Sequence, residues 1–348
     1  MTAAPSPLAI DTDLLVVGAG PCGLAVGVAA AEAGVPCVLL DRRTVVGTLE
    51  RYPLNMTFFS TPERLEIGGV PFVTASTKPT RQDGLVYYRK VAERFALDIR
   101  VGVEATAITP RPGGGFRVGV RHRDGEAVGS AANVVIATGY YDWPNRLGIP
   151  GEELPHVSHY FTEGHGYWRR RVVVVGAGNS AVDAALECWR AGAAVTLVHV
   201  GDALDGTVKP WVLPDMHNRM REGSIAVRWR TRVAAIAAGW VDLEGPAGPE
   251  RLPADGVLLM TGYHADTALV AGAGVPVDEA TGIPAHDEAT MATPVPGLYL
   301  AGVIASGKDA NRLFIENARG HGPAIVRHVL ARRAATAGGS ARSSGCAA

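Results

Sequence analysis

Residues 16–25 read VVGAGPCGLA, three spaced glycines with a cysteine, Cys22, between the second and third. After an apolar stretch, this spacing suits a turn in which each glycine has a steric role. Gly18 permits the tight bend, Gly20 lets the backbone approach a phosphate, and Gly23 lets the following helix pack on the strand. Free N–H groups at the start of the helix attract phosphate charge. The run, with its intervening Ala19 and Pro21, therefore predicts a phosphate-binding loop.

Two interpretations of Cys22 remain open. The positive end of a helix favours a thiolate, which is the reactive form of cysteine. A nearby pyrophosphate would oppose that shift, so the sequence does not give the sign of the pKa change. Alternatively, Cys22 is a small, soft residue that fills a turn. The remaining cysteines, Cys37, Cys188 and Cys346, show neither CxxC nor metal-ligand spacing, and we predict no metal site.

A possible ribose contact follows the glycine turn. The stretch PCVLLDRR predicts a buried strand that ends at Asp41, where a carboxylate can accept hydrogen bonds from a ribose diol. Arg42 and Thr48 are further candidates for contacts to the same nucleotide. Strand, glycine turn, helix and strand together form one βαβ unit.

The same order of elements returns at residues 170–200, RRVVVVGAGNSAVDAALECWRAGAAVTLVHV. The second loop candidates are Gly176, Gly178, Asn179, Ser180 and Ala181. Here the second strand lacks a terminal acid, and the absence of that repulsion favours NADPH over NADH. His199 and Lys209 are candidate contacts to this second nucleotide, although the nearby Asp202 weakens this signal. The alternative interpretation of His199 is a strand-end residue that faces water.

Two such units predict an α/β protein with two Rossmann-like domains, the NADPH domain inserted into the FAD domain. Strands that end in Thr138-Gly139 and Thr261-Gly262 occupy matching places in the two halves, and Gly262 is a further cofactor candidate. A strand at GLYLAGV and a final helix return to the first domain. We predict an FAD-binding domain from 10–150 and 289–335, an NADPH-binding domain from 151–288, and disordered tails at 1–9 and 336–348.

The composition limits the classes of binding partner that we expect for this protein. The 348 residues include 33 basic and 34 acidic ones, without a long block of either sign, so nucleic acid and anionic membranes are poor expected partners. No stretch approaches the roughly 20 apolar residues of a membrane span, and the first dozen residues lack a secretion signal. With scattered cysteines, these features predict a cytoplasmic protein.

The chain resembles the thioredoxin reductase-like flavoproteins with two dinucleotide-binding domains, and within them the bacillithiol-disulfide reductase family. The resemblance is carried by GAGPCGL, YPLNMTFFSTPERLEIGGVPF, KPTRQDGLVYYRKV, GAGNSAVDAALE, VKPWVLP, MTGYH and FIENARGHG. It covers nearly the whole chain outside the tails. It implies an NADPH-dependent FAD enzyme that reduces the disulfide of a low-molecular-weight thiol, bacillithiol.

The resemblance also implies roles for individual residues. Cys22 matches the proposed redox cysteine, and Gly302 and Val303 join Thr138 and Gly139 in holding FAD. The broader class has Gly-Asp where this chain has Gly302-Val303. The closer family has an arginine near position 200, where this chain has Val200, which leaves the preference for NADPH open.

Three other functions fit the two nucleotide loops. A flavin monooxygenase-like enzyme shares both loops, and HYFTEGHGYWRRRVVVVGAG partly matches its histidine-containing motif. A reductase of a protein partner such as ferredoxin or thioredoxin is a second alternative, although no basic docking face is evident. A redox sensor whose FAD does not turn over is the third. We also expect a homo-oligomer.

Overall fold

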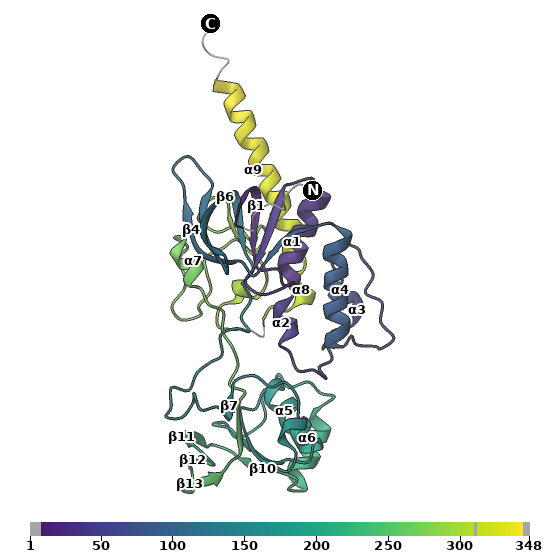
Figure 1. The fold of residues 1–348 in the computed structure, drawn as a ribbon, viewed down its shortest axis with the longest axis vertical. Helices are drawn as coiled ribbons and strands as arrows, with labels where there is room; N and C mark the ends of the chain where they lie inside the picture. The colour runs from purple at the N-terminus through teal and green to yellow at the C-terminus, as the bar shows by residue number, and fades with distance from the viewer. Residues whose placement is uncertain (1–7, 310–311, 344–348) are drawn as a thin grey trace. The chain divides into compact units, whose positions relative to one another are not determined.

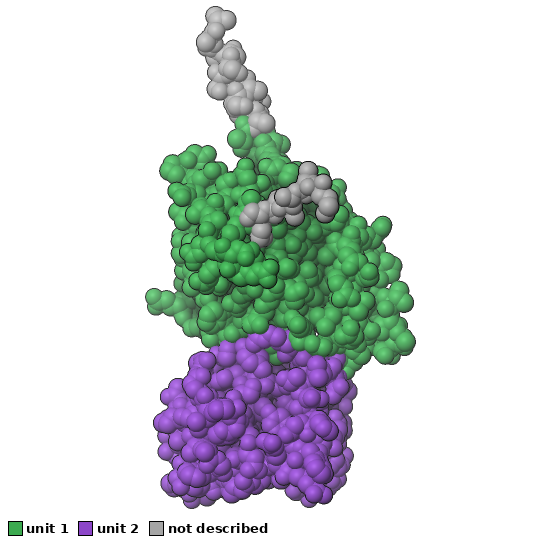
Figure 2. Space-filling view, in the orientation of Figure 1, with its two compact units in different colours: residues 1–50, 57–143, 264–348 green, residues 51–56, 144–263 purple. Residues whose placement is uncertain are grey.

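In the computed structural model, residues 8–309 and 312–343 are described, and they form two compact units. The first unit comprises Met1–Glu50, Thr57–Trp143 and His264–Ala348, and the second comprises Arg51–Met56 and Pro144–Tyr263 (Figure 2). The second unit is thus inserted into the first. This arrangement agrees with the predicted insertion of one Rossmann-like domain into another.

The first unit is built on a seven-stranded sheet of order β3-β2-β1-β6-β5-β4, with β15 paired to the end of β6. In its parallel part, the apolar stretches 14–17 of β1 and 38–40 of β2 are buried, as expected for strands that are covered on both faces. The antiparallel β4 and β5 extend from the long β6. The strands are β1 (Asp11–Val17), β2 (Cys37–Asp41), β3 (Asp98–Val101), β4 (Glu104–Pro110), β5 (Phe116–His122), β6 (Gly125–Ile136) and β15 (Leu298–Leu300).

Helix α1 (Pro21–Glu32) is the central helix of the first unit and contacts β1, β2, α4 (Arg81–Arg94) and α9 (His321–Ser343) (Figure 1). Its side chains from Gly23 to Ala30 are all buried, which small residues permit because neighbours approach from several sides. Tyr87 and Tyr88 on α4 pack beneath Phe72, as expected for core residues. The shorter helices are α2 (Gly47–Glu50), α3 (Pro62–Leu65), α7 (Ala268–Gly272), α8 (Ile315–Ala318) and the 3-10 helix η2 (Gly302–Ser306).

The second unit repeats this plan with a parallel sheet of order β10-β9-β8-β14-β7 and a separate antiparallel sheet, β11-β12-β13. Apolar cores fill both faces of the parallel sheet. Its strands are β7 (Val157–Ser158), β8 (Arg171–Val175), β9 (Ala194–Val198), β10 (Ile225–Arg228), β11 (Arg232–Ala237), β12 (Trp240–Gly245), β13 (Gly248–Pro253) and β14 (Gly256–Leu259). Its helices are α5 (Asn179–Arg190), α6 (Leu213–Arg221) and the 3-10 helix η1 (His165–Tyr167).

The unit boundaries differ from the predicted limits of 151 and 288. Residues 264–288 pack with the first unit, because α7 lies against β4 and buries Val270. Residues 51–56 belong to the second unit, where the N–H of Leu54 donates to the carbonyl of Thr162 over 2.9 Å. Neither segment is part of a sheet, so the strand pattern did not assign it.

The predicted tails also need correction. Helix α9 continues to Ser343, so residues 336–343 are helical where a disordered tail was predicted. At the other end, Leu8 lies in a turn, and Ile10 is buried against Gly129. The remaining tail residues, 1–7 and 344–348, lie outside the described part. Within the described residues, no helix has both the length and the apolar character required to cross a membrane.

Candidate dinucleotide-binding sites

The loop between β1 and α1 has the geometry that its three glycines predict. Gly18 has φ +111°, and a Cβ there would lie 2.3 Å from the carbonyl oxygen of Ala137. A Cβ at Gly23 would lie 1.9 Å from the carbonyl oxygen of Gly18, whereas one at Gly20 would meet nothing within 4 Å. Gly18 and Gly23 are therefore required by the fold. Gly20 instead leaves open space beside the start of the helix, as a phosphate cradle requires.

Strand register brings the other candidates of the first unit to the same sheet edge. Val17 pairs with both Leu40 and Ile136, and Ile136 pairs in turn with Leu300. Four parallel strands therefore end level with one another, and the carboxyl edge of such a sheet is where ligands bind. The residues that follow these strand ends are the glycine loop, Asp41, Thr138-Gly139 and Gly302-Val303.

The carboxylate of Asp41 supports the glycine loop. Its Oδ2 accepts a hydrogen bond from the N–H of Ala19 over 2.9 Å, and its Oδ1 accepts one from the N–H of Arg43 over 2.9 Å. Burial raises the pKa of Asp41, while these two N–H donors oppose the rise. Asp41 thus has a structural contact at the position predicted for the ribose acid. The neighbouring Arg42 pairs with Asp142.

Val46 is a supporting residue that the sequence did not reveal. It has φ +48°, a left-handed conformation that is strained for a β-branched side chain. Its N–H donates to the carbonyl of Ala19 over 3.0 Å, which ties the following segment to the glycine loop. The predicted Thr48, half-buried in α2, is held close to the loop through this contact.

Cys22 lies in the first turn of α1 and faces the loop that follows β15. A Cβ built at Gly302 would lie 3.0 Å from both Cβ and Sγ of Cys22. The N–H of Gly302 donates to Nδ1 of His321 over 3.2 Å, so the start of α9 is joined to the same loop. Burial raises the pKa of the Cys22 thiol to about 12. At this position burial therefore favours the thiol over the thiolate.

The second loop, between β8 and α5, has the same construction. Gly176 has φ +125°, and a Cβ there would lie 2.3 Å from the carbonyl oxygen of Met260. A Cβ at Gly178 would meet nothing within 4 Å. Ala181 replaces the third glycine and is fully buried. The hydrogen bond from Gly176 N–H to the carbonyl of Val198, at 3.0 Å, matches the 2.7 Å bond from Gly18 to Leu40.

Asn179 connects the second loop to the segment that contains Lys209. Its Nδ2 donates to the carbonyl of Thr207 over 3.1 Å, and its Oδ1 accepts from the N–H of Lys209 over 3.0 Å. The backbone of Lys209 therefore lies beside the N-terminus of α5, next to the exposed Ser180. His199 follows the end of β9, in the register position that Asp41, the last residue of β2, occupies in the first unit.

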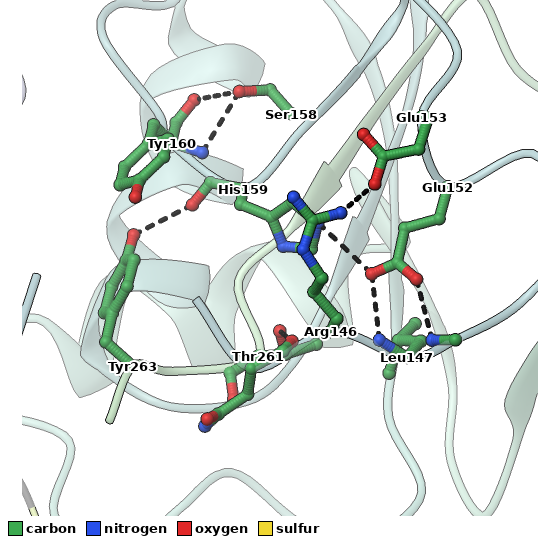
Figure 3. Close-up of polar contacts among 11 residues, drawn as sticks. Arg146, Leu147, Glu152, Glu153, Ser158, His159, Tyr160, Thr261 and Tyr263 are labelled. Atoms are coloured by element: carbon green, nitrogen blue, oxygen red, sulfur yellow. Dashed lines mark hydrogen bonds and ion pairs between the residues drawn. The ribbon is translucent and has the colours of Figure 1, made fainter. Parts of the chain in front are cut away.

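A polar cluster at the end of β14 supports Gly262 and was not predicted (Figure 3). Thr261 Oγ1 donates to the carbonyl of Asn145, and the Asn145 amide donates to the carbonyl of Thr261 over 3.1 Å. Nearby, the buried carboxylate of Glu152 accepts from the N–H groups of Leu147 and Gly148 and lies 3.2 Å from His159 Nε2. These contacts fix the crossover from residue 145 to 152 beside the Thr261-Gly262 turn.

The titration of this cluster follows from its burial. Burial favours the neutral forms of Glu152 and His159. The N–H groups of Leu147 and Gly148 nevertheless hold the pKa of Glu152 below its usual value. Burial lowers the pKa of His159, and the Glu152 carboxylate only partly offsets this effect. His159 is therefore neutral at pH 7. In the described residues, no group of three or more His, Cys, Asp or Glu side chains is arranged to hold a metal ion.

Both loops fit the phosphates of a dinucleotide. Neither α1 nor α5 has a side-chain cap or an acidic residue in its first turn, so the first N–H groups of each helix face the open side of Gly20 or Gly178. In the first unit, the candidates to hold FAD are Gly18 to Gly23, Asp41, Thr138-Gly139 and Gly302-Val303. In the second unit, the candidates to hold a nicotinamide dinucleotide are Gly176 to Ala181.

The sequence matches the family model of pyridine nucleotide-disulphide oxidoreductases over residues 15–302. It is 38% identical over 324 residues to a bacilliredoxin reductase from Bacillus subtilis (strain 168), which spans 93% of this chain and 99% of that protein. The fold is similar to that of a bacillithiol disulfide reductase from Bacillus cereus, with a TM-score of 0.90, 39% identity and coverage of 92% and 99%. The corresponding reductase from Staphylococcus aureus gives a TM-score of 0.88, 34% identity and coverage of 93% and 99%.

Proposed function

Because this chain belongs to the pyridine nucleotide-disulphide oxidoreductase family, we propose that it is an FAD-dependent enzyme that oxidises NADPH to reduce bacillithiol disulfide. One disulfide, one NADPH and one proton would yield two thiols and NADP⁺. The similarity over 99% of the Bacillus cereus reductase is the observation that carries this proposal. It extends through both nucleotide-binding units.

The residues of the first unit divide the binding of FAD between them. The open N-terminus of α1 at Gly20 would hold the pyrophosphate, and Asp41 would accept hydrogen bonds from the adenosine ribose. Thr138-Gly139 and Gly302-Val303 end the neighbouring strands and would contact the remaining parts of the cofactor. Bound FAD would accept two electrons from NADPH and pass them to the disulfide.

We propose Cys22 as the residue that reacts with the substrate. A Cys22 thiolate would attack one sulfur of the disulfide, form a mixed disulfide and release one thiol. The two electrons supplied by NADPH through the cofactor would then split this mixed disulfide into the second thiol and the Cys22 thiolate. The high pKa of this thiol in the absence of cofactors implies that it must lose its proton to a neighbouring group or to the leaving thiolate. The neighbouring His321 has an Nδ1 that accepts a hydrogen bond from Gly302, so this nitrogen carries no proton.

The test is an anaerobic assay of NADPH oxidation by the FAD-loaded protein with three oxidants. The oxidants are bacillithiol disulfide, oxidised bacilliredoxin and molecular oxygen, each supplied in a separate reaction as the sole oxidant. The proposal expects turnover with bacillithiol disulfide and two thiols per NADPH. Turnover with bacilliredoxin alone would replace the small disulfide with that partner. Oxygen consumption with a hydroxylated product would instead indicate a monooxygenase, and a flavin that NADPH does not reduce would indicate a redox sensor.

We further propose that the enzyme acts in the cytoplasm as a homo-oligomer. The described cysteines Cys22, Cys37 and Cys188 form no disulfide with one another, which suits a reducing compartment. Light scattering during size-exclusion chromatography tests the oligomeric state. A mass near 36.3 kDa, that of one chain, would contradict the oligomer.

A further inference from the structure

The two units can be compared residue by residue, because their strands pair in the same register. Val17 pairs with Leu40 in the first unit, and Val175 pairs with Val198 in the second. The next residue along the chain is Asp41 in one unit and His199 in the other. His199 therefore stands where a ribose acid would otherwise stand, beside the position of the adenosine ribose.

The same comparison extends to the adjacent strand and identifies Arg230. In the first unit, Gly102 N–H donates to the carbonyl of Arg43 over 3.0 Å. In the second unit, Arg230 N–H donates to the carbonyl of Gly201 over 2.8 Å, one strand along from His199. Both residues are left-handed, with φ +71° at Gly102 and φ +52° at Arg230. An arginine thus occupies a position at which the sister unit has a glycine.

This conformation is unfavourable for arginine and costs nothing for glycine. Strained residues of this kind are found at ligand sites, and Arg230 is one of five non-glycine residues with positive φ in the described part of the chain. Arg230 is exposed, and its Nη2 lies 3.2 Å from Oδ2 of Asp202. Each side chain of this pair is 68% exposed, and such ion pairs are weak, so a stronger anion can displace the carboxylate.

The two neighbouring arginines, Arg228 and Arg232, already have close partners. Arg228 binds Glu250 through two hydrogen bonds of 2.8 and 2.9 Å, and Arg232 pairs with Glu244. His199 packs edge-on to Trp229, with ring centroids 6.2 Å apart, and lies over the backbone of Gly201. The imidazole therefore lies on the loop of residues 199–201, whose Gly201 carbonyl accepts the hydrogen bond from Arg230 N–H.

We propose that Arg230 binds the 2′-phosphate of NADPH and sets the preference for NADPH over NADH, with Asp202 as its partner when no nucleotide is bound. This inference rests on the proposed function, in which the second unit receives NADPH. It explains how the chain can recognise a 2′-phosphate although position 200 is a valine. A guanidinium suits this role because its planar N–H groups can bind two phosphate oxygens together.

The experiment is equilibrium calorimetry of the FAD-loaded protein with NADP⁺ and with NAD⁺, which measures binding without turnover. Arg230→Gly removes the charge and the backbone strain together, and Arg230→Met removes the charge alone. Both are expected to weaken NADP⁺ binding by roughly 10- to 100-fold and to change NAD⁺ binding by less than about threefold. Asp202→Asn is expected to tighten NADP⁺ binding several-fold, because it removes the competing carboxylate.

Arg232→Met is the matched control, since it removes an exposed arginine two residues away that is paired with Glu244. It should leave both dissociation constants within about twofold. If Arg230→Gly retains the NADP⁺ to NAD⁺ ratio of the wild type, or if Arg232→Met loses it equally, Arg230 is not the determinant. If the wild type itself binds NADP⁺ no better than NAD⁺, the NADPH assignment fails first, and the inference fails with it.

Discussion

The side chain of Cys22 lies against the backbone of Gly302: a methyl group added to Gly302 would lie 3.0 Å from the Cys22 sulfur. Cys22 lies in the first turn of α1, whereas Gly302 follows β15 near the other end of the chain. The contact places the only cysteine of the glycine loops at the edge where the parallel strands of the first unit end. It also favours glycine at residue 302, since φ is +79° and an added Cβ would be in tight contact with the Cys22 side chain.

Replacing Cys22 with serine tests whether this sulfur reacts or only fills space. We expect Cys22→Ser to retain FAD and to lose disulfide-dependent NADPH oxidation by at least about 100-fold, because serine cannot form the mixed disulfide. Flavin absorbance measures retention, and thiol release measures turnover. Cys37→Ser, at a half-buried position in β2, is the control and should retain activity. Undiminished turnover by Cys22→Ser would assign Cys22 a packing role alone.

Gly20→Ala tests the phosphate cradle independently of folding. Gly20 has φ −72° and open space where a Cβ would be built, so alanine should change the stability of the FAD-free protein by less than about 0.5 kcal/mol. The added methyl group would nevertheless keep the pyrophosphate from the backbone, and we expect FAD retention to fall at least tenfold. Denaturant titration and flavin content measure the two effects.

Gly18→Ala provides the contrast for that experiment. Its Cβ would lie 2.3 Å from a backbone oxygen at φ +111°, so this variant should fail to fold rather than only lose FAD. Equal FAD retention in Gly20→Ala and the wild type would show that the pyrophosphate lies elsewhere.

Asp183 on α5 should make the stability of the protein depend on pH. Burial, followed by the charge of Glu187, raises the pKa of Asp183 to about 6. Because the folded value exceeds the unfolded value, the associated stability is complete below about pH 4 and is lost as pH rises towards 6. Asp183→Asn should therefore stabilise the protein by about 1–2 kcal/mol at pH 7 and by almost nothing at pH 4. Urea titrations at both pH values measure this, and an equal gain at both would contradict the ionisation argument.

Glu152 and Glu153 form a matched pair for testing the polar cluster of Figure 3. Glu152→Gln replaces one of two oxygens that accept backbone N–H bonds with an NH₂ group. We expect it to lower stability by about 1–3 kcal/mol. Glu153→Gln should cost less than about 0.5 kcal/mol, because that carboxylate is 78% exposed and pairs only at the surface with Arg146. Thermal unfolding of the two variants measures both effects. Equal stability of Glu152→Gln and Glu153→Gln would show that the Glu152 contacts do not stabilise the fold.

Acidification should weaken the same cluster. The pKa values of Glu152 and His159 are both below their usual values in the folded protein, so their contributions are present above the unfolded values and are lost as pH falls. We expect the melting temperature of the wild type to fall below about pH 6.5, with a smaller decrease for His159→Gln. An identical pH dependence in both proteins would remove His159 from this effect.

The sequence alone determined the two βαβ units, their glycine loops and the family resemblance. The reason is that these features are local: a buried strand, a glycine at fixed spacing and an amphipathic or small-residue helix each follow from neighbouring residues. Gly18, Gly23 and Gly176 have the steric roles that their spacing predicts. The absence of an acid at position 199 was likewise evident without a structure.

The tertiary structure decided what strand register and burial control. Strand register places Arg230 beside Gly201, and packing places Gly302 beside Cys22, although no local pattern links either pair. Burial raises the pKa of Cys22, and the sequence does not reveal how deeply that thiol is buried. Packing also decides that residues 51–56 belong to the second unit and residues 264–288 to the first. Sequence patterns specify local conformation, whereas desolvation and cross-strand distances arise only when distant segments pack together.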